Sequence, residues 1–159
     1  MANERILDGN VEYWWVTTLS NPASPAAAQI NAGVRLGNLI AKSDGVERSV
    51  EAGSVDTTPM TAKTKTAKPG TEELSVNGTF LRKSIGDDAW NAMAGKPEGY
   101  LVERRGVPWA TNATAGQKVS VAHLQAGPRN EVKVAENETD KFSVDYFNQS
   151  DFIEEATVA

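Results

Sequence analysis

The stretch Ser43–Thr71, SDGVERSVEAGSVDTTPMTAKTKTAKPGT, decides how the rest of the chain is interpreted. It contains no Leu, Ile, Phe, Trp or Tyr, although strand-like segments flank it on both sides. Loops longer than about 12–15 residues are uncommon in compact domains and are usually functional or disordered. The stretch also carries too little apolar surface to order itself against its own domain. We therefore expect a long inter-strand arm that becomes ordered only on a neighbouring copy, so assembly rather than catalysis is the leading interpretation.

Composition favours a single globular domain over residues 1–159, with the arm at about residues 43–71 and extended termini. A chain of 159 residues, 40% of them hydrophobic, is long enough to bury one core. No apolar run approaches the roughly 18 residues of a membrane span, so we expect no membrane partner. The first residues do not read as a secretory signal. The absence of cysteine excludes disulfides, thiol catalysis and cysteine metal sites, and it suits synthesis in a reducing cytoplasm.

The charge of the chain is unevenly distributed. The net charge is −5, and the segment from Arg129 to Ala159 holds eight acids and three bases, whereas the rest of the chain is balanced. An acidic protein without a basic stripe is a poor candidate for gripping nucleic acid, because Lys and Arg supply most non-specific affinity for phosphate. Such a protein could still enclose DNA without holding it.

Residue patterns predict a mainly β fold. The segment VEYWWVTTL is β-branched and aromatic, and in ELSVNGTFLRK Leu74, Val76 and Phe80 alternate with polar residues. We expect strands over residues 11–19, 34–41, 73–83, 100–105, 117–125 and 141–147, and short helices over 24–31, with Ser24 at the N-cap, and 87–93. The predicted architecture is a β-sandwich or partly open barrel with one or two short flanking helices.

The candidate chemical residues have structural explanations. His123 is the only histidine, and no local pattern supplies a nucleophile and an orienting acid. Asp87 and Asp88 suit the start of a helix, where acids meet the positive end of its dipole. Trp14 and Trp15 must point to opposite faces of a strand, so we expect one to pack in the core and the other to cover a flanking helix. We predict no catalytic residue, no metal site and no cofactor.

The arm contains the first group of candidate interface residues. On a strand, Lys63 and Lys65 would share one face. We expect the arm lysines to dock on an acidic surface of another copy, for which residues 131–155 are the obvious partner. The alternative is a solvated, flexible tip. The candidate ring-interface residues of the arm are Thr57, Met60, Lys63, Lys65 and Lys68.

The termini contain the second group of candidate interface residues. Ile6 and Leu7 near one end, and Phe152 and Ile153 near the other, are apolar residues in otherwise polar segments. We expect them to dock on adjacent copies. The alternative is that they cover their own domain.

Several segments, read in order, resemble the major tail tube proteins of long-tailed, siphovirus-like bacteriophages, especially those infecting actinobacteria. The resemblance covers most of the chain outside the arm and rests on the order and spacing of the segments. The segments are Tyr13–Val16 (YWWV), Ser24–Val34 (SPAAAQINAGV), Asp87–Trp90 (DDAW), Gly99–Gly106 (GYLVERRG) and Gly116–Val119 (GQKV).

The resemblance implies a structural subunit that forms rings, commonly hexameric, stacked into a hollow tube for genome delivery. Neighbouring subunits would complete a β-lined bore, while the arm and the termini bridge rings. The implied partners are further copies of the chain, the tape-measure, tail-terminator and distal tail proteins, and DNA that passes through the lumen without specific binding. The implied location is the virion tail, after synthesis in the host bacterial cytoplasm.

Other function classes stay open at this point. The first is a ligand- or carbohydrate-binding β-sandwich module. The second is a tail-completion or decoration protein that forms a single ring, and the third is a small enzyme with an unrecognised site. Elementary physics supports the tube independently, since open sheets leave unpaired edges that identical neighbours can close.

Overall fold

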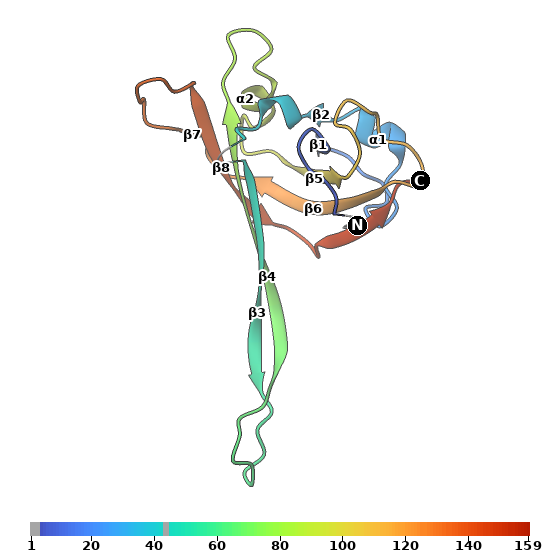
Figure 1. The fold of residues 1–159 in the computed structure, drawn as a ribbon, viewed down its shortest axis with the longest axis vertical. Coiled ribbons are helices and arrows are strands. Elements are labelled where there is room, and N and C mark those ends of the chain that lie inside the picture. Colours follow the sequence, from blue (N-terminus) through green and yellow to red (C-terminus); the bar gives the residue numbers. More distant parts are fainter. Residues whose placement is uncertain (1–3, 43–44) are drawn as a thin grey trace.

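The computed structural model describes residues 4–42 and 45–159. Within these ranges the chain forms one antiparallel sheet of nine strands with two short α-helices (Figure 1). The elements are β1 (Val11–Val16), α1 (Ala27–Asn31), β2 (Val34–Arg35), the 3₁₀ helix η1 (Gly37–Leu39), β3 (Val46–Asp56), β4 (Ala67–Leu81), α2 (Asp88–Ala92), β5 (Glu98–Arg105), β6 (Lys118–Ala126), β7 (Asn130–Glu131), β8 (Lys141–Asn148) and β9 (Ile153–Thr157). The main strand order is β2-β1-β5-β6-β8-β4-β3, while β7 pairs with β8 and β9 pairs with β6.

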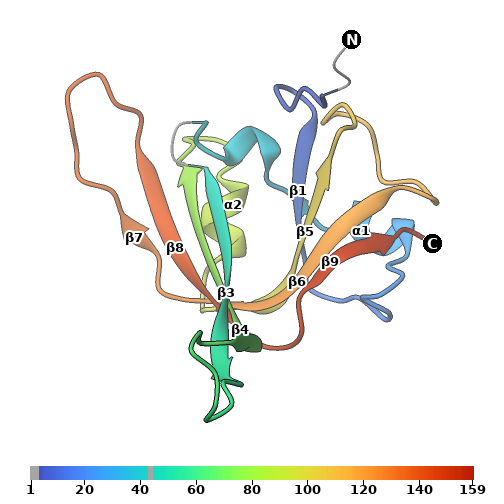
Figure 2. The ribbon, with the colours of Figure 1, turned by 60° about the horizontal axis from the view of Figure 1, so that its bottom comes forward.

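The sheet curves around α2 and forms a partly open barrel (Figure 2). An isolated bridge between Ile40 and Phe80 brings the chain that follows β2 against β4 on the open side. The enclosed core contains Trp15, whose ring centroid lies 5.7 Å from that of Tyr146, and Phe80, which lies 5.4 Å from Phe142. The predicted mainly β class, with a partly open barrel and short flanking helices, is confirmed.

A second apolar cluster covers the other face of the sheet. Trp14 packs there with Ile30 of α1, Val102 of β5 and Ala156 of β9. Successive side chains of a strand point to opposite faces, so adjacent tryptophans of β1 serve two different clusters. The prediction that one tryptophan packs in the core and the other covers a flanking helix is confirmed.

The first helix is shorter than predicted. It begins at Ala27, and Ala26 rather than Ser24 is its N-cap. The hydroxyl of Ser24 donates instead to the carbonyl of Thr157, 3.2 Å away. The Ala27 N–H donates to the carbonyl of Ala159 at 3.3 Å, so the C-terminal residues occupy the start of the helix. A contact between the C-terminal residues and the start of α1 therefore replaces the predicted local cap.

The predicted strand over residues 34–41 is also wrong beyond its first two residues. It continues as the 3₁₀ helix η1, in which the N–H of Gly37 donates to the carboxylate of Glu12 at 2.8 Å. A Cβ at Gly37 would overlap that carboxylate, so the turn requires a glycine. The strand that begins at Val34 ends here because the Gly37 N–H bonds to the buried carboxylate of Glu12 on β1. The local sequence pattern does not reveal this acceptor.

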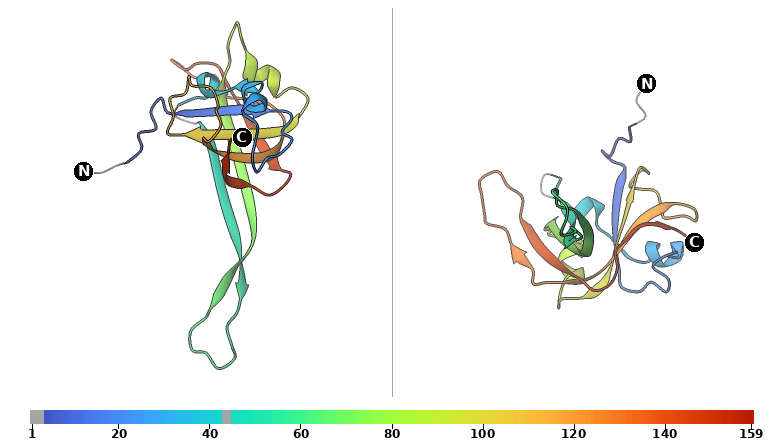
Figure 3. Two further views of the ribbon diagram at one scale, coloured as in Figure 1. Left: turned by 90° about the vertical axis from the view of Figure 1, so that its right-hand side faces the viewer. Right: turned by 90° about the horizontal axis from the view of Figure 1, so that it is seen from below.

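The arm differs most from its prediction. The expected unstructured segment is a hairpin of β3 and β4, paired from Val46 opposite Gly78 to Asp56 opposite Ala67, with a register shift between Ala52 and Ser54. The hairpin extends away from the body (Figures 1 and 3), and nearly all of β3 is exposed. The inward-facing backbone groups of the two strands bond to each other, which requires no large apolar side chains. Contacts of Arg48 join the root of the hairpin to the body, and the ordering of the arm on a neighbouring copy stays a prediction. Residues 43–44 lie outside the described residues.

Candidate assembly surfaces

The hairpin exposes unpaired backbone along both of its edges. Among the described residues, β3 pairs with no strand other than β4, and β4 pairs with β8 only over Val76–Leu81. The outer edge of β3 and residues 67–75 of β4 therefore present free donors and acceptors. Such edges are templates for another chain unless they are covered. The arm is therefore the part of the described chain in which backbone hydrogen bonding between strands is least complete.

A polar cluster fixes the root of the arm to the body. Arg48 of β3 lies 3.8 Å from the carboxylate of Glu103 on β5, and its guanidinium stacks 4.5 Å from the ring centroid of Phe152. Arg105 also pairs with Glu103, whose side chain is only 7% exposed. Burial, followed by the charge of Glu103 and a hydrogen bond to it, raises the pKa of Tyr13 to about 12. These contacts fix the direction in which the hairpin extends from the body.

The tip of the arm is closed by its own hydrogen bonds. The N–H of Thr57 donates to the carbonyl of Thr66 at 3.0 Å, and the two threonine hydroxyls lie 3.0 Å apart. The carboxylate of Asp56 accepts from the N–H of Thr58 at 2.9 Å, and hydrogen bonding to Thr58 lowers the pKa of Asp56. Thr57, a predicted interface residue, thus also closes the turn.

The remaining predicted arm residues all face solvent. Met60 is 100% exposed. Lys63, Lys65 and Lys68 are exposed as well, and residues 57–71 include no Asp or Glu. The tip is therefore an apolar side chain surrounded by positive charge.

A groove of about 690 Å³ lies where the arm leaves the body. Its lining includes Glu47, Glu73, Asp145 and Phe147, and the ring of Phe147 is 59% exposed. Glu73 also lies directly opposite Glu51 in the β3–β4 register. Like charges at opposed positions of a hairpin are destabilising. This acidic face therefore contributes little to the stability of the isolated chain.

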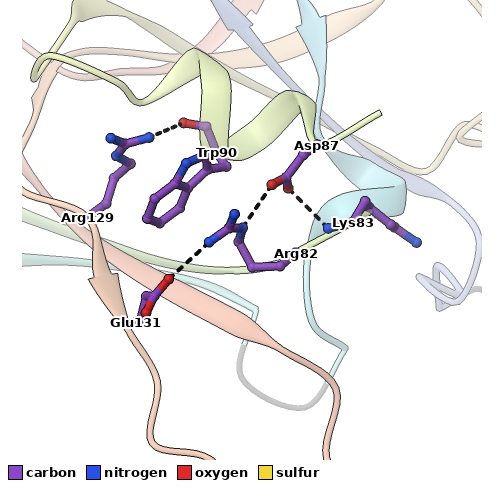
Figure 4. A network of polar contacts seen from close by, with 6 residues as sticks. All are labelled: Arg82, Lys83, Asp87, Trp90, Arg129 and Glu131. Carbon is purple, nitrogen blue, oxygen red and sulfur yellow. Dashed lines mark hydrogen bonds and ion pairs between the residues drawn. The ribbon is translucent and has the colours of Figure 1, made fainter. Parts of the chain in front are cut away.

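At the end of the molecule opposite the arm tip, Trp90 stacks with two arginines (Figure 4). The guanidinium carbons of Arg82 and Arg129 lie 3.8 Å and 3.9 Å from the ring centroid of Trp90. Arg82 also pairs with Asp87 at 2.8 Å and with Glu131 at 3.1 Å. Cation–π stacking of this kind contributes roughly 0.5–2 kcal/mol per contact. The network ties β4, α2 and β7 together.

The acids of residues 131–155 do not form one surface. Glu131 and the loop that follows β7 lie at the end of the molecule that carries α2 (Figure 1). Glu155 belongs to β9, where it lies 3.7 Å from Lys118. The single acidic partner surface expected from the sequence is thus two separate patches, because β8 carries the chain from one to the other.

The predicted terminal residues fall into two classes. Ile6 is 73% exposed and Leu7 is 40% exposed. Phe152 and Ile153 are half-buried, and each packs against one of the two core clusters of its own chain. Strand β9 accounts for this burial, because it pairs with β6. Both side chains keep part of their surface exposed, so their docking on an adjacent copy stays a prediction.

His123 has partners that the local sequence did not reveal. Its Nε2 lies 2.8 Å from Glu98, its Nδ1 lies 3.3 Å from the hydroxyl of Ser150, and its ring stacks on Tyr100 at 4.6 Å. Strand pairing brings these residues together, so only the sheet register could have shown the contact. Glu98 and Ser150 are exposed, and the group is a surface network along β5 and β6.

The described residues offer neither a metal-binding cluster nor a membrane-spanning helix. Between residues 4 and 159, apart from 43–44, no group of three or more His, Cys, Asp or Glu side chains could hold a metal ion. Within the same ranges, no helix has the length and apolar character needed to cross a membrane.

Comparisons with known proteins agree with this geometry. A family model described as "Phage tail tube protein" matches residues 1–159. No curated protein matches the chain. A solved structure of the anti-feeding prophage (AFP) baseplate, 6-fold symmetrised, has a TM-score of 0.55 at 7% identity, covering 97% of this chain and 98% of that chain. That likeness shows a shared fold.

Two gene transfer agent (GTA) structures are also similar. The tail of the empty GTA particle, computed with helical refinement and C6 symmetry, has a TM-score of 0.49 at 13% identity and covers 96% of both chains. The virion of the native GTA particle has a TM-score of 0.47 at 12% identity, covering 80% of this chain and 89% of that chain.

Proposed function

The chain belongs to the phage tail tube protein family, and from this premise we propose that copies of it complete one another through the arm. As a member of this family it is a structural subunit of the virion tail and not an enzyme. The match over the whole chain does not favour a ligand-binding sandwich. The proposal concerns how the copies fit together.

The unpaired edges of the hairpin carry this proposal. The outer edge of β3 and the distal part of β4 have no partner within the described chain. Identical neighbours arranged around an axis can cover such edges, and a sheet that closes on itself has none. Contacts of the head-to-tail type produce rings when the rotation closes and stacks when a rise is added. We propose stacked rings of six copies, the number that the family resemblance implies.

The interface residues of the proposal come from the arm and the N-terminal segment. Met60, Lys63, Lys65 and Lys68 are exposed on the arm, and Ile6 and Leu7 are exposed beside β1. Each lies where a neighbouring copy could cover it. Phe152 and Ile153 keep part of their surface exposed, so they can contribute to a neighbour only through that part.

The charge of the chain supports passage of DNA without binding. The net charge is −5, and the groove at the arm root is lined by Glu47, Glu73 and Asp145. Acids repel phosphate, and no stripe of Lys or Arg supplies the usual non-specific affinity. The tape-measure protein would lie inside such a tube, while the tail-terminator and distal tail proteins would cover its two ends.

The test removes the tip and keeps the strands. In the variant, Thr57–Thr66 is replaced by Asn-Gly, which suits a two-residue hairpin turn between Asp56 and Ala67. We expect a folded monomer, with an unchanged near-UV circular dichroism spectrum and melting temperature, that does not form tubes in electron micrographs. Tubes of normal length and number from this variant would refute the role of the arm.

A further inference from the structure

The tip of the arm and the loop between β7 and β8 lie at opposite ends of the molecule. Figure 1 shows the hairpin tip at one end of the longest axis, and the loops around α2 and after β7 at the other. Figure 3 shows the same separation from the side. One copy therefore cannot bring its tip to its own far end. A second copy, placed head-to-tail, can.

The two ends have complementary chemistry. The tip presents fully exposed Met60 among lysines, with no acid between residues 57 and 71. The far end presents Val134 and Ile85, which are 94% and 93% exposed. Residues 131–140 contain four acids and one lysine. We define residues 131–140 as the acidic platform. An apolar centre with a rim of opposite charge on each side is the usual composition of a specific interface.

The acidic platform is held in place before any partner arrives. The stack of Arg82, Trp90 and Arg129 fixes β7 against α2. The backbone N–H of Arg82 donates to the backbone carbonyl of Asp140 at 2.9 Å. The ammonium group of Lys141 lies 3.2 Å from the carboxylate of Glu138. A surface that is ordered in advance loses less conformational entropy on binding.

We propose that the arm tip of one copy docks on the acidic platform of a copy in the adjacent ring, with Met60 against Val134 and the tip lysines facing the acids of residues 131–140. This inference rests on the proposed function, since it names the partner surface of the same arm. It also assigns a direction to the stack: every arm points toward the α2 end of the next ring.

Cysteine cross-linking tests the contact directly, because the chain has no cysteine of its own. Copies carrying Met60→Cys are mixed with copies carrying Val134→Cys, assembled into tubes and oxidised. We expect a covalent dimer of twice the chain mass that disappears on reduction. The matched control replaces the Val134→Cys copies with Thr18→Cys copies, since Thr18 is exposed but lies outside the platform. The control mixture should give at least tenfold less dimer.

Charge reversal provides a second, independent measurement. The double variant Lys63→Glu, Lys65→Glu should lower the yield of tubes at least tenfold at low salt. Adding Glu136→Lys and Asp140→Lys to the same chain should restore most of that yield, whereas the platform changes alone should lower it. All four side chains are exposed, so folding should not change.

The possible results separate this inference from the proposed function. If the unmodified chain forms no tubes, the proposed function fails and the inference fails with it. If tubes form but the Met60→Cys and Val134→Cys pair gives no more dimer than the control, only the docking proposal is overturned. If the cysteine variants do not assemble, the charge reversal decides, and absence of rescue overturns the docking proposal.

Discussion

At the scale of single residues, strands β1 and β5 each carry one fully buried charged side chain. Glu12 and Arg104 are both fully buried and lie opposite each other in the β1–β5 register. The carboxylate of Glu12 accepts from the N–H groups of Tyr13 and Gly37, at 2.9 Å and 2.8 Å. The guanidinium of Arg104 lies 4.8 Å from the ring centroid of Trp14. Opposite charges at this depth are costly to separate.

Removing the Glu12 carboxylate should therefore destabilise the fold. We expect Glu12→Ala to lower the free energy of unfolding by about 1–3 kcal/mol, since it removes the buried acceptor of the Tyr13 and Gly37 N–H groups. Glu12→Gln should cost less, because an amide oxygen still accepts from Gly37 N–H. Urea denaturation followed by tryptophan fluorescence measures both values. Equal stability of the Glu12→Ala variant and the unmodified chain would contradict the importance of these buried hydrogen bonds.

The pKa of Tyr13 predicts a loss of stability in alkali. Burial and Glu103 raise this pKa to about 12, compared with about 10 in an unfolded chain. A raised folded-state pKa means that the contribution is complete below pH 10 and is lost as the pH rises toward 12. We expect the free energy of unfolding to fall over this window, with a smaller slope for Tyr13→Phe. Identical slopes for the two proteins, measured by urea denaturation between pH 9 and pH 12, would contradict this assignment.

At the scale of elements, the sequence patterns predicted the strands with large alternating apolar residues. Residues 100–105 and 141–147 each fall within a strand of the structure, and the predicted strand 117–125 does so except for Gln117. Strand β3 was missed because its apolar residues are valine and alanine on an exposed hairpin. Strands β7 and β9 are short and are defined by their partners, β8 and β6, so their local sequences carry little signal.

Only part of the candidate interface could be predicted from the sequence. The exposed tip lysines followed from local composition, because a segment without large apolar residues cannot be buried. The anchor formed by Arg48, Glu103 and Phe152 could not be predicted, since its members come from three separate parts of the chain. The burial of Phe152 was also invisible without the pairing of β9.

The anchor at the arm root should restrict the motion of the whole hairpin. We expect Arg48→Ala to speed amide hydrogen exchange in β3 while changing the global free energy of unfolding by less than about 1 kcal/mol, because Arg48 is partly exposed. Arg48→Lys keeps the charge but loses the planar stacking on Phe152, so its effect should be intermediate. Unchanged exchange in β3 of the alanine variant would show that the arm is positioned by other contacts.

At the scale of the whole molecule, the compact body and the arm have different sources of stability. Two apolar clusters stabilise the body, one inside the curved sheet and one beneath α1 and β9. The hairpin beyond the body has only its own cross-strand bonds, exposed lysines and opposed acids. A two-stranded hairpin is marginally stable by itself in water. The arm therefore gains the most from contact with further copies.

Cryo-electron microscopy of the purified chain at high concentration tests the central claim most directly. We predict hollow tubes of stacked rings in which a neighbouring copy covers the outer edge of β3 and the arm tip lies on an adjacent ring. A preparation that stays monomeric at high concentration would contradict the account. So would tubes in which the β3 edge and the arm tip both face solvent.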